Sequence, residues 1–262
     1  MSESVLHIST SSGVAQVQLS RPGVRNAFNA EVIAELRRAF EQLGADAGVR
    51  AIVLSGEGKT FCGGADINWM RGSLELSREE NVADAQRMSE MFRAIDRCPK
   101  PVIARVHGAA LGGGAGLVAV CDVAIASNET IFGFTETKLG ILPAVISPFV
   151  LAKIGESHAR ALFLTGERFD AKRAAAIGLV HEVVAHSDID LAVHRVLEEI
   201  KTASPSAIAV AKNIIATVSA ATYDETLHIT SQAIAEQRTS AEGQDGLRAF
   251  LERRKAAWIA DE

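Results

Sequence analysis

The chain has 262 residues, of which 48% are hydrophobic and 23% are charged, and its formal net charge is −5. The acidic balance excludes a broad nucleic-acid-binding surface, and no apolar run approaches the roughly 18 residues that a membrane span needs. The length fits one large domain, or one domain with a helical appendage.

The three cysteines, at positions 62, 98 and 121, show no metal-ligand spacing. Each lies among apolar or small residues, so we expect packed, reduced thiols and neither a metal site nor a redox cofactor. No basic segment followed by an apolar one opens the sequence, which predicts that no secretion signal is present. The expected location is the cytoplasm.

The first half of the chain alternates predicted strands and helices. Residues 5–8 and 14–19 flank a Ser-Ser-Gly turn and predict a hairpin. Asn29 is the predicted N-cap of a helix over 30–43, whose apolar side chains share one face. The remaining strand predictions are 51–55, 102–106 and 123–126, with an extended piece at 131–134. Helices are predicted at 65–71 and 81–96, a small-residue turn at 108–111, and loops at 56–64 and 135–144.

The second half is mostly helical. One short strand is predicted at 179–184. The predicted helices are 148–154, 158–164, 171–177, 191–201, 206–218, 225–236 and 243–257. Strands that lead and helices that trail indicate an α/β core with a helical C-terminal part.

Three consecutive glycines, Gly112 to Gly114, follow the predicted strand 102–106 and precede an apolar segment, 117–121, that can continue as a buried helix. Such an arrangement brings backbone N–H groups without helical partners to a helix N-terminus, where they favour an anion or a developing oxyanion. No Gly-Lys-Ser/Thr follows, and Leu117 replaces the third glycine of a dinucleotide fingerprint, which argues against nucleotide binding. A tight structural turn is the alternative.

A weak internal repeat strengthens the oxyanion interpretation. Strand 51–55 leads through Cys62-Gly63-Gly64-Ala65 to a helix start, as strand 102–106 leads through Gly112-Gly113-Gly114. If these two turns lie side by side, they aim two N–H groups at one point, as stabilisation of an oxyanion requires.

Five segments together resemble the enoyl-CoA hydratase/isomerase, or crotonase, superfamily. They are RPGVRNAFN (21–29), FCGGADINWM (61–70), HGAALGGGAGLVAVCD (107–122), FGFTETKLGILP (132–143) and SAEGQDGLRAFLERRKAAW (240–258). The resemblance implies an α/β fold, a spiral of ββα units with a C-terminal helical trimerisation region. It also implies a homotrimer or a dimer of trimers. We therefore expect a core with an acyl-CoA site over 1–200 and a helical oligomerisation region over 201–262.

The resemblance also implies an acyl-CoA substrate, with no cofactor beyond the coenzyme A of that substrate. The N–H groups of Ala65 and Gly113 are the implied donors to the thioester carbonyl. The implied substrate-binding residues are Val24, Arg25, Ala27, Gly63, Asp66, Ile67, Gly112, Gly116 and Lys255. Lys255 reaches the coenzyme A phosphates from a neighbouring subunit in this interpretation. For Arg25 and Lys255, a solvated surface charge is the alternative.

One departure from the superfamily pattern bears on the chemistry. Hydratases of the superfamily carry two glutamates, and the residue at the position of the first is Gly116 here, whereas Glu136 stands at the second. Hydration needs a base for water and an acid for Cα, so Glu136 acts in both roles through one water, or another group helps. Isomerases of the superfamily use a single glutamate at the Glu136 position. Without the resemblance, Glu136 would be interpreted as a solvated loop carboxylate.

The segments LPAVISPFV (142–150) and GERFDA (166–171) add a resemblance to bacterial methylglutaconyl-CoA hydratases, which serve leucine breakdown. Such substrates carry a distal carboxylate, and Arg71, Lys138 and Ser147 are candidate partners for it. The leading hypothesis is hydration of a 2-enoyl-CoA. The alternatives are an enoyl-CoA isomerase and an acyl-CoA-binding homologue without catalysis.

Overall fold

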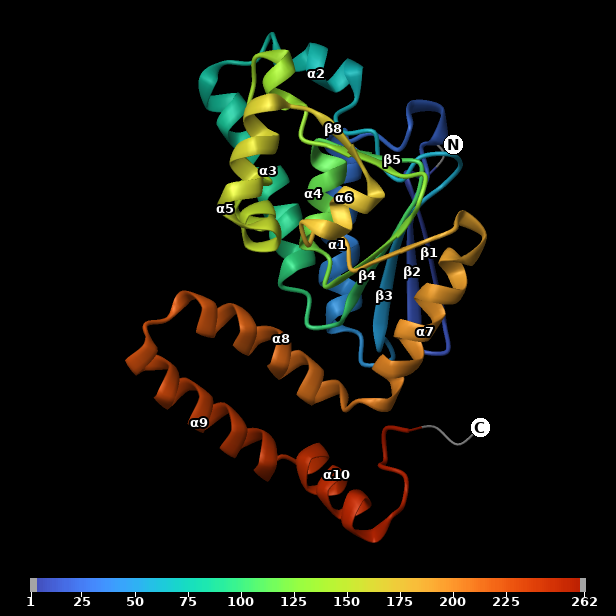
Figure 1. Cartoon of the computed structure of the whole chain (residues 1–262), viewed down its shortest axis with the longest axis vertical. Helices are drawn as coiled ribbons and strands as arrows, with labels where there is room; N and C mark the ends of the chain where they lie inside the picture. Colours follow the sequence, from blue (N-terminus) through green and yellow to red (C-terminus); the bar gives the residue numbers. More distant parts are fainter. Residues whose placement is uncertain (1–3, 260–262) are drawn as a thin grey trace.

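The computed structural model describes residues 4–259, and a six-stranded sheet is its central element (Figure 1). The strand order is β1-β2-β3-β4-β6-β9. The bounds are β1 Leu6–Ser11, β2 Val14–Leu19, β3 Ala51–Gly56, β4 Val102–Val106, β6 Val123–Ser127 and β9 Glu182–Val184. The antiparallel pair β1–β2 is the predicted hairpin, and the other neighbouring pairs are parallel. These strand predictions are confirmed, although β9 is shorter than predicted.

A second sheet of three strands was not foreseen. Its order is β5-β7-β8, with β5 Ala109–Leu111, β7 Ile131–Gly133 and β8 Arg168–Asp170. The prediction of a turn at 108–111 is therefore wrong, and β8 was not predicted. Three-residue strands carry too few residues to show alternation, and their ladder partners lie far away in the sequence.

The two sheets are connected by repeated units. Strand β4 of the large sheet continues into β5 of the small sheet and then into helix α4 (Gly113–Val120). Strand β6 likewise continues into β7 and then into the short 3-10 helix η2 (Glu136–Leu139), which lies in the predicted loop 135–144. The first of these is the ββα unit that the resemblance implies.

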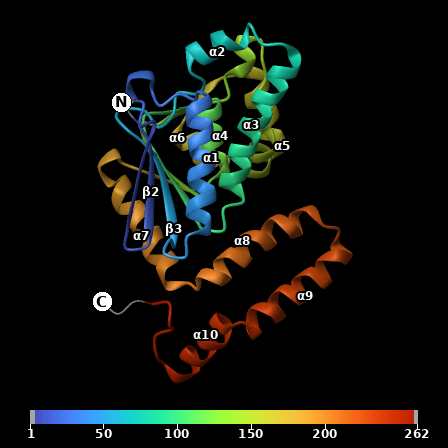
Figure 2. The same cartoon turned by 180° about the vertical axis from the view of Figure 1, so that it is seen from behind.

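Helices cover both faces of the large sheet. On one side lie α1 (Ala30–Ala45) and α3 (Arg78–Asp96), and α1 is in front when the molecule is seen from behind (Figure 2). On the other side α7 (Ile189–Thr202) packs its apolar residues against a separate core cluster (Figure 1). The Asn29 cap is confirmed, since its Oδ1 accepts from Val32 N–H at 2.9 Å.

Several helix ends differ from prediction for local reasons. Helix α3 begins three residues early because Ser77 and Glu80 form a capping box. Helix α2 (Ile67–Ser73) begins two residues late because Asp66 caps it. Helix α5 (Ser147–Thr165) spans two predicted helices, which meet at Gly155 with φ +71°. Helix α6 (Ala171–Ala176) is close to its prediction.

Three helices form an arm that extends from the core: α8 (Pro205–Ala220), α9 (Tyr223–Thr239) and α10 (Ala241–Glu252) (Figures 1 and 2). The prediction of helix to residue 257 is wrong, because Arg253 takes a left-handed conformation that ends α10. Lys212 Nζ of α8 pairs with Asp122 Oδ2 of the core at 2.7 Å. Arg50 donates to the carbonyls of Lys201 and Ala203, beside the start of the arm.

Among the helices of residues 4–259, none has both the length and the apolar composition needed to traverse a bilayer. The division of the chain at residue 200 remains a prediction, although α7 ends at Thr202 and the arm begins at Pro205.

Candidate active site

The two glycine-containing turns lie side by side. Cys62 and Ala110 form a parallel bridge, in which Cys62 N–H donates to Ala109 O and Leu111 N–H donates to Cys62 O, both at 3.1 Å. A Cβ on Gly114 would overlap the Cys62 carbonyl oxygen and lie 2.9 Å from Cys62 Cβ, closer than Cβ atoms come to other groups. Only glycine therefore lets the start of α4 approach the first turn so closely.

The N–H groups of Ala65 and Gly113 have no acceptor within the described part of the chain. On either side of Ala65, Phe28 N–H donates to Gly64 O at 2.7 Å and Asp66 N–H donates to Phe28 O at 2.8 Å, so this ladder does not use the Ala65 N–H. Gly113 is the first residue of α4, where an N–H has no intrahelical acceptor. Two donors on adjacent segments are thus available for a ligand oxygen, and the α4 dipole adds to the second.

Glu136 lies against this second turn. A Cβ on Gly112 would be 3.1 Å from Glu136 Oε1, and Gly112 has φ +51° and ψ −122°, a conformation that favours glycine. Glu136 Oε2 is buried without a hydrogen-bond partner among the described residues. Burial raises the pKa of the Glu136 carboxyl above its usual range, and a bond from its own backbone N–H opposes this only in part. A desolvated carboxyl next to Gly112 is suited to proton transfer.

Hydrocarbon surrounds the start of α4. A Cβ on Gly113 would be 2.9 Å from the Phe28 ring and 3.0 Å from Met88 Cε. Phe28 and Phe92 meet edge to face, with ring centroids 6.1 Å apart. The sequence predicted a helix over 81–96, which includes Met88 and Phe92, but assigned neither residue to the site.

The residues expected on the coenzyme A side form a second group near the first turn. Gly63 N–H donates to Arg25 O at 2.8 Å, and Arg25 is exposed. Val24 and Ile67 are exposed as well, whereas Ala27 is buried. An exposed cation with apolar neighbours is compatible with the predicted coenzyme A contact.

Asp66 has a structural role that the prediction did not include. Its carboxylate accepts from Arg21 Nη2 at 2.8 Å and from Asn68 N–H at 2.8 Å, and the residue is buried. Burial alone would raise the pKa of this carboxyl, but the bonds from Arg21 and Asn68 outweigh it and lower the pKa. The side chain of Asp66 therefore caps α2 and binds Arg21, and its contact with the substrate stays a prediction.

Lys255 is not brought to this site within the chain. It follows α10, and both views place α10 far from α4 (Figures 1 and 2). The prediction assigned it to the site of a neighbouring subunit, and that assignment stays a prediction. Of the candidate partners for a distal carboxylate, Arg71 and Lys138 are exposed, and Ser147 Oγ donates to Ala144 O at 2.7 Å.

Two residues near the turns do not act chemically on this geometry. Burial raises the pKa of the Cys62 thiol to about 12, which leaves it protonated. His107 Nε2 lies 2.8 Å from Gly58 O, and His107 O accepts from Phe61 N–H, so this residue fastens the loop before Cys62. The packed Cys62 thiol agrees with the role expected from the sequence.

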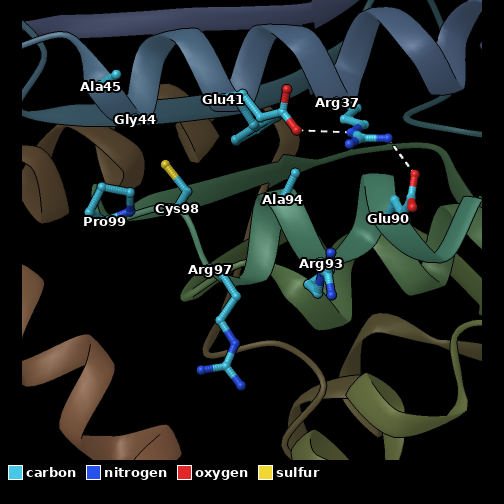
Figure 3. A pocket seen from close by; sticks show the side chains of 11 residues that line it. Arg37, Glu41, Gly44, Ala45, Glu90, Arg93, Ala94, Arg97, Cys98 and Pro99 are labelled. Atoms are coloured by element: carbon cyan, nitrogen blue, oxygen red, sulfur yellow. Dashed lines mark hydrogen bonds and ion pairs between the residues drawn. The ribbon is translucent and has the colours of Figure 1, made fainter. Parts of the chain in front are cut away.

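A separate cavity of about 420 Å³ lies between α1 and α3 (Figure 3). Arg37 donates to Glu41 at 2.9 Å and also pairs with Glu90 on its rim, and Cys98 and Pro99 lie at one end. None of the predicted site residues lines it. Residues 4–259 contain no group of three or more His, Cys, Asp or Glu side chains arranged to hold a metal ion.

Comparisons with known proteins agree with one another. A family model described as "Enoyl-CoA hydratase/isomerase" matches residues 9–261. The short-chain-enoyl-CoA hydratase of Clostridium acetobutylicum is 33% identical over 244 residues, which cover 92% of this chain and 92% of that protein. An enoyl-CoA hydratase structure from Shewanella pealeana superposes with a TM-score of 0.94 at 37% identity, covering 97% of this chain and 96% of the other. Pseudomonas aeruginosa AtuE gives a TM-score of 0.95 at 36% identity, covering 98% and 100%.

Proposed function

The chain belongs to the enoyl-CoA hydratase/isomerase family and has the crotonase fold, and from this premise we propose that it adds water across the 2,3-double bond of an enoyl-CoA thioester. One observation carries the proposal. The Glu136 carboxyl, whose Oε2 is buried, lies against Gly112, directly beside the N–H of Gly113; neither this N–H nor that of Ala65 has an acceptor in residues 4–259.

In the proposed reaction, the thioester carbonyl oxygen accepts from Ala65 N–H and Gly113 N–H. When the oxygen of water bonds to C3, the electron pair of the double bond moves toward C2 and the carbonyl, where negative charge develops. Fixed backbone donors stabilise that charge without having to reorganise, and one such donor is typically worth about 10²- to 10³-fold in rate. The N-terminal end of the α4 dipole acts in the same direction.

Glu136 moves the protons. Its carboxylate takes a proton from the attacking water, and the resulting carboxylic acid delivers that proton to C2. The water thus becomes a C3 hydroxyl and a C2 hydrogen, and Glu136 returns to its starting form. Because the base form is required first, turnover should fall as the pH drops through the raised pKa of Glu136.

Isomerisation of a 3-enoyl-CoA is a second candidate, and one observation favours it. Gly116 carries no side chain, so α4 supplies no second carboxylate at the position where the family's hydratases have one. A single carboxylate suffices to take a proton from C2 and return it to C4. The retained and desolvated Glu136 argues against a binding-only homologue.

For the acyl group we propose 3-methylglutaconyl-CoA, on the sequence resemblance alone. The exposed cations Arg71 and Lys138 are candidate partners for its distal carboxylate. We also propose a homotrimer or a dimer of trimers assembled through the arm. Support comes from apolar side chains that the arm leaves exposed, including Leu227, Phe250 and Leu251.

The test is an assay of the purified protein with three thioesters: 3-methylglutaconyl-CoA, crotonyl-CoA and a 3-enoyl-CoA. Loss of the conjugated-thioester absorbance with either of the first two is the expected result. Gain of that absorbance with the third, without hydration of the others, would replace hydratase by isomerase. Binding of coenzyme A esters without any conversion would contradict both activities.

A further inference from the structure

Helix α4 continues the candidate site away from Glu136. A Cβ on Gly112 would lie 3.1 Å from Glu136 Oε1, and Gly116 lies one helical turn further on, with its N–H bonded to Gly112 O at 3.1 Å. One turn of helix advances about 5.4 Å, which is the length of a few carbon–carbon bonds. A substrate that presents C2 and C3 to Glu136 therefore extends its acyl chain toward the level of Gly116.

The space beside Gly116 is filled by Ile146. A Cβ on Gly116 would overlap Ile146 Cγ2 and would lie 3.0 Å from Ile146 Cβ and 3.2 Å from Phe92 Cζ. Ile146 is 2% exposed. It stands at the N-cap of α5, where its carbonyl accepts from Val150 N–H at 3.0 Å, so its backbone is fixed by the helix that follows.

Aromatic rings back this contact. Phe92 lies between Phe28, at 6.1 Å, and Phe149, at 5.9 Å between ring centroids. Phe28 in turn contacts Gly113, so one hydrocarbon wall runs from the donor residue Gly113 to Gly116 and Ile146. Close-packed interiors do not yield to added volume, and this wall leaves room for a longer chain only if one of its members becomes smaller.

We propose that Ile146 is a specificity-determining residue that limits the length of the acyl chain. Its side chain fills the space beside Gly116 and so ends the apolar part of the site. This inference rests on the proposed function, since it needs an enoyl-CoA whose C2 and C3 lie at Glu136. The ligand class is a short acyl group, and the closing surface is formed by Ile146 with Phe92 behind it.

The experiment compares crotonyl-CoA with 2-hexenoyl-CoA, as the ratio of their kcat/KM values, in the wild-type protein, Ile146→Val and Ile146→Ala. In an apolar pocket one methylene changes discrimination by about 10- to 200-fold. We expect the ratio to move toward 2-hexenoyl-CoA by about 10-fold or more in Ile146→Ala, and by a smaller step in Ile146→Val.

The matched control is Ile103→Ala. Ile103 is fully buried on β4 but belongs to the cluster on the α7 side of the sheet. Its truncation creates a similar defect without touching Gly116, so the ratio should stay at the wild-type value. An unchanged ratio in Ile146→Ala, or an equal shift in Ile103→Ala, would overturn the inference while leaving the proposed function intact. A wild-type protein inactive on every enoyl-CoA would instead defeat the proposed function.

A second pair of variants tests the contact itself. Gly116→Ala should lose activity because its Cβ has no space beside Ile146, and Gly116→Ala combined with Ile146→Ala should recover part of it. A Gly116→Ala variant as active as wild type would contradict the packing on which the inference depends.

Discussion

Helices α4 and α8 are both rich in small and apolar residues, yet they differ in what covers them. Every residue of α4 is buried within its own chain, whereas no residue of α8 is buried. Gly113 lies in this buried helix, and Glu136 Oε2 is buried within the single chain. The arm, by contrast, exposes apolar side chains that only another surface can cover. We therefore expect the chemistry in the core, and we propose that assembly uses the arm.

The largest expected effect after loss of Glu136 comes from forcing the two turns apart. Gly114→Ala places a Cβ against the Cys62 carbonyl and displaces the N-terminus of α4. We expect kcat/KM to fall by about 10²-fold or more, comparable with removal of one oxyanion donor. Gly72→Ala is the matched control, because a Cβ there meets nothing within 4 Å. Equal activity of the two variants would mean that the turns can separate without consequence.

Substitutions of exposed apolar residues in the arm should change the oligomeric state. Phe250→Ser with Leu251→Ser removes two side chains that are 82% and 78% exposed in the single chain. If a second copy covers them, light scattering should show the proposed trimer shifting to smaller species at concentrations at which the wild type stays assembled. An unchanged mass would place the interface elsewhere.

Glu136 should also affect folding stability, and its raised pKa determines whether the effect is stabilising or destabilising at a given pH. A carboxyl whose folded-state pKa is raised stabilises the fold fully below its unfolded pKa, and that contribution is lost as pH rises through the folded value. Glu136→Gln should therefore melt at a higher temperature than wild type at neutral pH. The difference should shrink as the pH falls through the raised pKa of Glu136, and it should be gone by about pH 4. A variant that is less stable at neutral pH would contradict the desolvation of this carboxyl.

The smallest effect is expected at the joint between arm and core. Lys212→Ala removes the ion pair with Asp122, whose two side chains are partly buried. Denaturant unfolding should show that the free energy of unfolding falls by about 1 kcal/mol or less, as is usual when an ion pair near the surface is removed. A loss several times larger would contradict the interpretation of this contact as an ordinary ion pair near the surface.

Much of the fold could be predicted because its signals are local. Asn29 caps a helix through a bond to Val32, three residues away, and the glycines of 112–114 predict a strand-to-helix turn. The contact of Ile146 with Gly116 could not be predicted, because 30 positions of chain separate them and no periodicity links them. The same limit hid strand β8, whose three residues are ordered by a partner far away in the sequence.

The site was predictable to a similar degree. The repeat of two glycine turns indicated adjacent donors, and the family resemblance singled out Glu136 from other loop carboxylates. The structural use of Asp66 was not visible, because its partner Arg21 lies 45 residues away. The hydrocarbon wall formed by Phe28 and Phe92 depends on packing between the segment before α1 and helix α3, which sequence patterns do not report.

The most direct test of the account measures turnover and binding by Glu136→Gln together. Glutamine keeps the size of the side chain but cannot take a proton from water. The account predicts that hydration of the enoyl-CoA substrate falls by about 10²- to 10⁴-fold, while the affinity for the saturated acyl-CoA stays within a few-fold of wild type. A Glu136→Gln variant that retains wild-type turnover would contradict the assignment of Glu136 as the acid and base of this site.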